Sequence, residues 1–311
     1  ASVQTQMDQA ASDWGDRWEA AFTPGNKHYS GHLPTLETAD ADMAHVYYLG
    51  VLSLLCLEKN VTDTHTQTTW TRAYVTGGPR TAVTANFLWD MPYQSTLLSL
   101  LDPAFVRGYI LKALLVNIYA SNAIDFMSGE GRGRWYSFND LSVFTLIRNY
   151  VRISDDDSLL LEVAIPSDTT CSDHNFNCTV LGWLHATANH YQQLNTTAGL
   201  SDYGENQNLL ECVPRYQHCV PSLNAANVWM GQTLADMYQR LLDDTASAKH
   251  KVFTQIIAAS SVKQDPRREI SRLRKASAGI FTALQKQYTA GQGVWRTLYP
   301  DGTEIGVRTV V

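Results

Sequence analysis

The chain has 311 residues, of which 44% are hydrophobic and 17% charged, so it can bury a sizeable core and is not disordered. Its 24 basic and 30 acidic residues give a formal net charge of −6 without any block of like charges, which argues against a nucleic-acid partner. The longest apolar run, 46–57, is too short to span a bilayer, so no membrane partner is expected. Because no basic-then-apolar leader begins at Ala1, we expect a processed chain or a fragment.

Apolar residues recur at helical spacing along almost the whole chain. Residues 4–22 form an amphipathic pattern, whereas 41–57 is more apolar and is expected to be a helix buried on several sides. Asp102-Pro103 and Asp265-Pro266 each predict a helix start, with aspartate as the N-cap and proline in the first turn. The predicted helices span 4–22, 41–57, 95–101, 102–120, 138–151, 182–194, 222–242, 246–262 and 265–288.

Strand signals are confined to 70–75 and 294–311, the latter with a turn at Pro300-Asp301-Gly302. The connections between the predicted helices are unusually long and carry Trp, Gly, Asp and Glu. They cover 23–39, 76–94, 128–137 and 199–221. Long ordered loops on a helical scaffold usually carry function. We therefore expect an all-α toroid of paired helices with a loop-built cleft, forming one domain over residues 1–311.

Sequons and cysteines bear on the compartment of the protein. Asn-X-Ser/Thr acceptors occur at Asn60, Asn177 and Asn195. Two cysteine pairs are each seven residues apart, Cys171 with Cys178 and Cys212 with Cys219. Both intervals resemble loops, so two local disulfides are feasible, which leaves Cys56 as a free core thiol. The alternatives are five reduced cysteines in a cytosolic protein, or zinc bound by Cys171, His174 and Cys178 at a spacing that matches no established pattern. We expect a secreted, disulfide-bonded glycoprotein.

Three clusters combine aromatic side chains with carboxylates or amides. They are 87–93 with Trp89 and Asp90, 129–136 with Glu130, Trp135 and Tyr136, and 201–230 with Asp202, Glu211, Arg215 and Asn224. Aromatic faces cover the apolar side of a pyranose ring, and carboxylates and amides bind its hydroxyls. Hydrolysis of a glycosidic bond needs one acid to protonate the leaving oxygen and a second carboxylate to activate water or attack. Together the clusters indicate a sugar site.

Each cluster also has a purely structural interpretation. Asp90 stands where an N-cap would, and Asn224 fits helix packing as well as a pocket. The glycine-rich loop 129–133 lacks the preceding strand and the Gly-Lys-Ser/Thr of a nucleotide site. His185 and His190 lack His-Glu-x-x-His spacing, so we expect them to be structural or sugar-contacting rather than zinc ligands.

Taken together, the motifs resemble one glycosidase family. The strings 202–204 (DYG), 208–216 (NLLECVPRY) and 222–230 (SLNAANVWM) are similar to six-hairpin glycosidases of the mannosylglycerate hydrolase-like group, relatives of trehalase and of the processing α-glucosidase of N-glycan maturation. Residues 87–90 (FLWD) resemble their Trp-Asp substrate-binding motif. Segments 31–36 (GHLPTL) and 299–302 (YPDG) are also similar, and the resemblance extends from about residue 13 to the C-terminus.

The resemblance implies an (α/α)6 toroid that hydrolyses an α-glucoside or α-mannoside with inversion and without a metal or organic cofactor. The register of Pro214-Arg215 places Glu211 at the general-acid position, where the family has Asp, and Asp202 or Glu205 are possible substitutes. The residues that the resemblance and the clusters assign to substrate binding are Trp89, Asp90, Glu130, Trp135, Tyr136, Arg215 and Asn224. Nine predicted helices stand where six hairpins need twelve, and the relatives place their base beyond a strand pair like the last one here. A partial catalytic domain is therefore expected.

Two other classes of function remain open. A non-catalytic carbohydrate-binding relative would keep the cleft without the base, and a helical-repeat interaction scaffold would explain the helices but not the clusters. The toroid predicts that Asp90 and Glu211 line one cleft beside Trp89 or Trp135. The structural alternative predicts that Asp90 caps its own helix and that Glu211 pairs with Arg215 on the surface.

Overall fold

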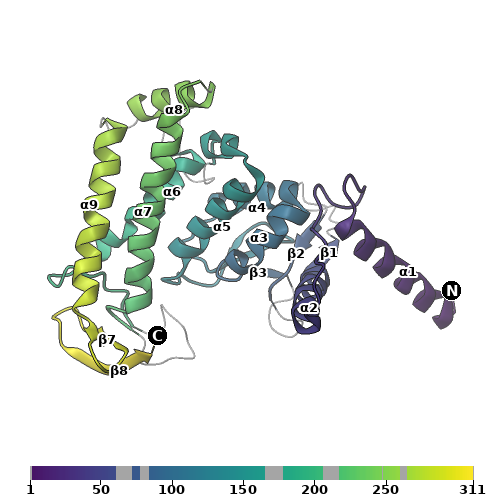
Figure 1. The fold of residues 1–311 in the computed structure, drawn as a ribbon, viewed down its shortest axis with the longest axis horizontal. Coiled ribbons are helices and arrows are strands. Elements are labelled where there is room, and N and C mark those ends of the chain that lie inside the picture. The colour runs from purple at the N-terminus through teal and green to yellow at the C-terminus, as the bar shows by residue number, and fades with distance from the viewer. Residues whose placement is uncertain are drawn as a thin grey trace. The chain divides into compact units, whose positions relative to one another are not determined.

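The computed structural model describes residues 2–60, 72–77, 84–164, 178–205, 217–246, 248–259 and 265–310 (Figure 1). This part of the chain is mostly helical, which confirms the all-α class. Its α-helices are α1 (Val3–Phe22), α2 (Ala41–Leu57), α3 (Met91–Leu101), α4 (Pro103–Leu115), α5 (Asn139–Ser154), α6 (Val180–Asn189), α7 (Pro221–Asp243), α8 (Ala248–Ala259) and α9 (Pro266–Gln285). Two short 3₁₀ helices are η1 (Asp157–Leu161) and η3 (His190–Leu194).

The described strands are short and form three antiparallel sheets. The first pairs β1 (Glu58–Asn60) with β2 (Arg72–Tyr74), the second orders β3 (Ala85–Phe87), β4 (Ala123–Asp125) and β5 (Gly131–Arg132), and the third orders β6 (Tyr288–Thr289), β7 (Val294–Leu298) and β8 (Glu304–Val310). The strands expected within 70–75 and 294–311 are confirmed, with a turn in which Gly302 N–H donates to the Tyr299 carbonyl at 2.9 Å. The missed strands, at most three residues long, are too short to show alternation.

The two Asp-Pro helix starts behave differently. At α9 the prediction is confirmed, because the Asp265 carboxylate accepts a hydrogen bond from Arg267 N–H at 3.0 Å. At α4 the expected cap is wrong: Ser30 Oγ accepts from Ala104 N–H at 2.9 Å and donates to Asp102 at 2.7 Å. Asp102 is thus free to pair with Arg72 of β2 at 2.7 Å, and its hydrogen bond from Ser30 ties the loop after α1 to the start of α4.

Two compact units are present. Unit 1 comprises Ala1–Lys112, Ala123–Arg132 and Leu146–Asp156, and unit 2 comprises Ala113–Asn122, Gly133–Thr145 and Asp157–Val311. The expected single domain over 1–311 stays a prediction. The predicted site residues are divided between the units: Trp89, Asp90 and Glu130 belong to unit 1, and Trp135, Tyr136, Asp202 and Asn224 belong to unit 2.

Unit 1 contains a buried ion network centred on Glu58. Glu58, only 4% exposed, accepts from Tyr29 OH at 2.8 Å and pairs with Arg72 at 3.1 Å. A buried carboxylate is tolerable because these donors replace its lost hydration. The network therefore fixes the loop after α1 against β1 and β2.

The apolar helix α2 is not buried on several sides as expected. Its buried residues are Val51, Leu54 and Leu55, whereas Met43, Val46, Leu49 and Leu52 are 42–69% exposed. Cys56, expected to be a core thiol, is exposed as well. The prediction failed because hydropathy measures how apolar a segment is and not what covers it. Within the described residues, no helix is long and apolar enough to cross a membrane.

Unit 2 is built on the long helices α7 and α9, which lie side by side (Figure 1). Their axes approach closely at Gly231, where an added Cβ would stand 2.5 Å from Ser277 Oγ. Leu234 and Tyr238 of α7 and Leu273 of α9 are buried. The chain segments before α7 and after α9 are joined by Cys219 N–H, which donates to the Leu298 carbonyl at 3.0 Å.

Candidate functional site

Asp90 lies at the N-cap position of α3 but does not cap it, since its side chain makes no capping hydrogen bond. The carboxyl instead hydrogen-bonds with the side chains of Thr76 and Trp89. Burial raises the pKa of Asp90, and the two hydrogen bonds partly oppose that shift. The capping alternative for this residue is therefore wrong, and a half-buried carboxyl beside an indole is left for another role.

The glycine-rich loop forms the β4–β5 hairpin of unit 1. Buried Asp125 accepts hydrogen bonds from the backbone N–H groups of Met127 at 2.8 Å and Ser128 at 3.2 Å, and it pairs with Arg132. These amide groups are thus committed to a carboxylate of the protein itself, unlike those of a phosphate-binding loop. Glu130, a predicted sugar ligand, is exposed on this hairpin.

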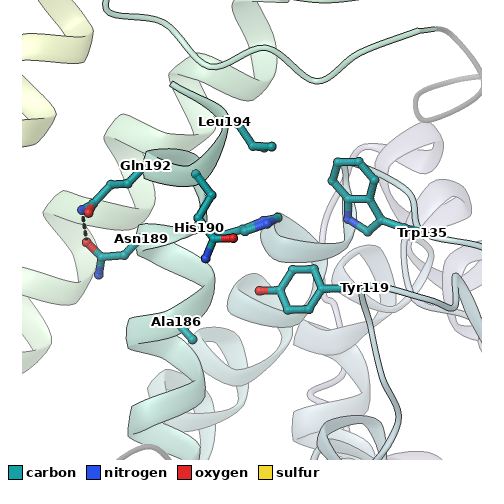
Figure 2. A pocket seen from close by; sticks show the side chains of 8 residues that line it. Tyr119, Trp135, Ala186, Asn189, His190, Gln192 and Leu194 are labelled. Atoms are coloured by element: carbon teal, nitrogen blue, oxygen red, sulfur yellow. Dashed lines mark hydrogen bonds between the residues drawn. The ribbon is translucent and has the colours of Figure 1, made fainter. Parts of the chain in front are cut away.

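Unit 2 contains a pocket of about 640 Å³ (Figure 2). Its lining comes from the segment before α5 and from the end of α6 through η3. The lining residues are Tyr119, Trp135, Ala186, Asn189, His190, Gln192, Gln193 and Leu194. The volume lies within the range of about 300–1,000 Å³ that is typical of small-molecule sites.

A buried carboxylate holds the histidine of this pocket. Asp140, in the first turn of α5 and 6% exposed, accepts from the Tyr119 hydroxyl at 3.0 Å and contacts His190 Nδ1 at 2.7 Å. Burial, reinforced by the charge of Asp140, raises the pKa of Tyr119, so its phenol stays protonated and donates. Sequence analysis missed Tyr119 and Asp140, and an aspartate in a helix's first turn gave no signal beyond favourable dipole placement.

Trp135 is the predicted sugar ligand that does line this pocket. Its ring lies 6.1 Å from the His190 ring, centroid to centroid, at an interplanar angle of 78°. Its buried indole N–H has no hydrogen-bond acceptor among the described residues. Neighbouring Tyr136 is not part of the lining; its ring lies under the Arg134 guanidinium at 5.8 Å.

The two histidines of the predicted helix 182–194 have different roles. His185 contacts the Tyr238 hydroxyl at 3.0 Å, and burial lowers its pKa, so it is a neutral structural residue. His190, five positions on, reaches the pocket because α6 ends at Asn189 and the chain continues as η3. Asn189 itself is fixed, since its side-chain oxygen accepts from Arg272 at 2.6 Å and from Gln192 at 2.9 Å.

Asp202 forms a second carboxylate–histidine contact in unit 2. Its carboxylate lies 2.9 Å from His218 Nδ1, 16 residues away in the chain, and His218 Nε2 lies 3.6 Å from Glu205. His218 has a left-handed backbone with φ 59°, which is uncommon outside glycine. In the sequence, Glu205 and His218 lie on either side of the predicted general acid Glu211. Glu211 and Arg215 themselves lie outside the described residues.

Asn224 is not placed to line a pocket. It is fully buried in the first turns of α7, where its side-chain oxygen accepts from Ser201 N–H at 2.8 Å. Its amide nitrogen donates to the carbonyls of Ser201 at 3.2 Å and Val220 at 3.0 Å. The assignment of Asn224 to sugar binding is corrected. Its side-chain amide instead pairs with the buried backbone N–H and carbonyl of Ser201, which would otherwise be left without partners.

The cysteine expectations have mixed outcomes. Cys219 carries a free, buried thiol whose pKa is raised to about 11 by burial and by Asp202, which contradicts the expected Cys212–Cys219 disulfide. Cys178 is buried, and its expected partner Cys171 lies outside the described residues, so that disulfide stays a prediction. Among the described residues no cluster of three or more His, Cys, Asp or Glu side chains is suited to a metal ion. The zinc alternative involves Cys171 and His174, outside that part of the chain.

Comparison with protein-family models and with curated proteins found no match to this chain. Function is therefore inferred from the residues and the geometry of the site.

Proposed function

We propose that this protein is a glycoside hydrolase that binds a sugar ring in the pocket of unit 2. The observation that carries the proposal is the pocket lining, which joins aromatic side chains, exposed amides and an imidazole held by a buried carboxylate. This combination suits a sugar, because one face of a pyranose is apolar and its edge is covered with hydroxyls. The further proposal that the helical hairpins belong to an (α/α)6 toroid rests on the family resemblance.

The binding step is supported by the positions of Trp135 and the two glutamines. The Trp135 ring offers a flat apolar face that can cover one face of a sugar ring. Burying this face is favourable because it removes apolar surface from water and desolvates no charge. Gln192 and Gln193 are exposed at the pocket and carry both donor and acceptor groups for hydroxyls. Trp89 and Asp90 of unit 1 likewise combine an aromatic ring with a polar group, and the resemblance implies that they also bind sugar.

The hydrolytic step rests on the resemblance and on the general chemistry of glycosidases. Glu211 would donate a proton to the leaving oxygen, with Asp202 or Glu205 as alternative donors and Arg215 orienting nearby carboxylates. A second carboxylate would activate water on the opposite face of the ring, which inverts the anomeric centre. The chemistry needs no cofactor, and the sequons at exposed Asn195 and elsewhere agree with a secretory protein.

One observation favours a second candidate, a carbohydrate-binding protein without hydrolytic activity. No carboxylate lines the described part of the pocket, and both oxygens of nearby Asp140 are engaged by Tyr119 and His190. A site that only binds sugar needs no free carboxylate, whereas hydrolysis does.

The two candidates are separated by activity and binding measured on the full chain. Release of reducing sugar from α-glucosyl and α-mannosyl substrates is measured for the wild type and for Glu211→Gln, and affinity is measured in parallel by calorimetry. A hydrolase loses activity in Glu211→Gln while retaining sugar binding, and Trp135→Ala weakens both. Trp295→Ala, which alters a tryptophan of β7 that does not line the pocket, is the matched control. Binding without turnover selects the second candidate, and absence of both refutes the proposal.

A further inference from the structure

The imidazole of His190 is locked in one orientation. Asp140 is nearly inaccessible to water, and its two oxygens are engaged separately, one by Tyr119 and one by His190 Nδ1. A carboxylate only accepts hydrogen bonds, so Nδ1 must carry the proton of the neutral imidazole. The lone pair is therefore on Nε2, which has no hydrogen-bond partner among the described residues. The pocket thus receives an acceptor from His190.

Trp135 supplies a hydrogen-bond donor to the pocket, where His190 supplies an acceptor. Its indole nitrogen can only donate, and this donor is buried without an acceptor in the described structure. An unsatisfied buried donor is unfavourable, so a ligand group that accepts from it is favoured. Figure 2 shows the indole with its nitrogen on the side turned toward His190.

We propose that this pair recognises a vicinal diol of the ligand, an inference that rests on the proposed sugar-binding function. One hydroxyl donates to His190 Nε2, and the adjacent hydroxyl oxygen accepts from Trp135 Nε1. The rings are close enough for one pair of neighbouring hydroxyls, with centroids 6.1 Å apart and planes nearly perpendicular. A single hydroxyl that donated to Nε2 and accepted from Nε1 would also satisfy both groups, but it would make only one hydroxyl position of the sugar matter, whereas a diol makes two adjacent positions matter. A carboxylate, which only accepts, leaves the lone pair of Nε2 unpaired.

Asp140 is then a positioning residue, because it acts on the ligand only through His190. Asp140→Asn presents either an amide oxygen or an amide N–H to Nδ1, so the imidazole is no longer held in one tautomer. Tyr119→Phe removes the donor on the other carboxylate oxygen and weakens the same restraint. Neither change removes a group proposed to touch the sugar.

The first test needs no ligand. Nitrogen-15 NMR of the His190 ring at pH 8 is expected to show the Nδ1–H tautomer in the wild type and a mixture of tautomers in Asp140→Asn. An Nε2–H tautomer in the wild type would overturn the inference, whatever the protein binds.

The second test measures affinities of methyl α-glucoside, methyl α-mannoside and their monodeoxy analogues by calorimetry. Removal of either hydroxyl of one adjacent pair is expected to weaken binding about 10-fold, as expected for one lost hydrogen bond of about 1.4 kcal/mol. Trp135→Phe keeps the aromatic face, loses the N–H and should show a similar loss, and the deoxy penalty at one hydroxyl should disappear. His250→Gln and Trp295→Phe, which alter a histidine of α8 and a tryptophan of β7, should bind normally.

The outcomes separate this inference from the proposed function. If the parent glycosides bind but no monodeoxy analogue binds less tightly than they do, or only one does, the diol contact is refuted and the sugar site stands. If no glycoside binds, the proposed function and the inference fall together.

Discussion

Replacing Asn224 by alanine tests whether this buried amide organises the fold. The change removes the acceptor for Ser201 N–H and a donor to the Ser201 carbonyl, 23 residues away in sequence. Ser201 is 1% exposed, so water does not replace these partners without a structural change. The Val220 carbonyl keeps its helical partner, because Asn224 N–H also donates to it at 3.3 Å.

Two backbone groups are therefore left unpaired by Asn224→Ala. At about 1–3 kcal/mol each, the expected loss in the free energy of unfolding is about 2–6 kcal/mol. This is a large fraction of the roughly 5–15 kcal/mol that stabilises a typical protein. Asn224→Asp is expected to be at least as damaging, because its carboxylate faces the carbonyls of Ser201 and Val220 at pH 7.

Urea denaturation followed by circular dichroism and tryptophan fluorescence measures the effect. Gln239→Ala is the matched control, since within the described residues the side-chain amide of Gln239, on the same helix, makes one hydrogen bond, an exposed one to Asp243 at 2.8 Å. It should change stability by less than about 0.5 kcal/mol. If Asn224→Ala unfolds at the same urea concentration as this control, the structural role assigned to Asn224 is wrong.

Three further predictions follow from buried or strained groups. Burial lowers the pKa of His185 below its ordinary 6.5, so the unfolded chain binds more protons below that pH. The free energy of unfolding, measured by urea titration, should therefore decrease as the pH is lowered from 7.5 to 5.5. His185→Gln should show a smaller decrease, and the same pH dependence in both proteins would contradict the prediction. Burial raises the pKa of Asp90, so Asp90→Asn should raise the melting temperature at pH 7, with a gain that shrinks toward pH 4; a lower melting temperature at pH 7 would refute the assignment. Gly133 and Gly291 both have positive φ, but only Gly133 would place a Cβ 2.1 Å from Asn122, so calorimetry should find Gly133→Ala less stable than Gly291→Ala.

Local pattern was enough to locate the helices. The expected 222–242 and 265–288 match α7 (Pro221–Asp243) and α9 (Pro266–Gln285) closely, and Asp265 caps α9 as predicted. A helix is determined by contacts between residues three and four apart, and its start by a cap one to three residues away. Both kinds of contact join residues that are close together in the sequence, so the sequence pattern predicts them. The aromatic Trp135 could be proposed for a sugar site on the same local grounds.

The contacts that decide the site depend on segments far apart in the chain. Asp140 reaches His190 across 50 residues, and Ser30 caps α4 from 74 residues upstream of Ala104, which displaced the local candidate Asp102. Residue type gives each of these side chains a range of partners, and periodicity does not select among them. Only packing of the helices brought one donor to each acceptor, since a buried polar group must find its partner wherever the fold supplies one.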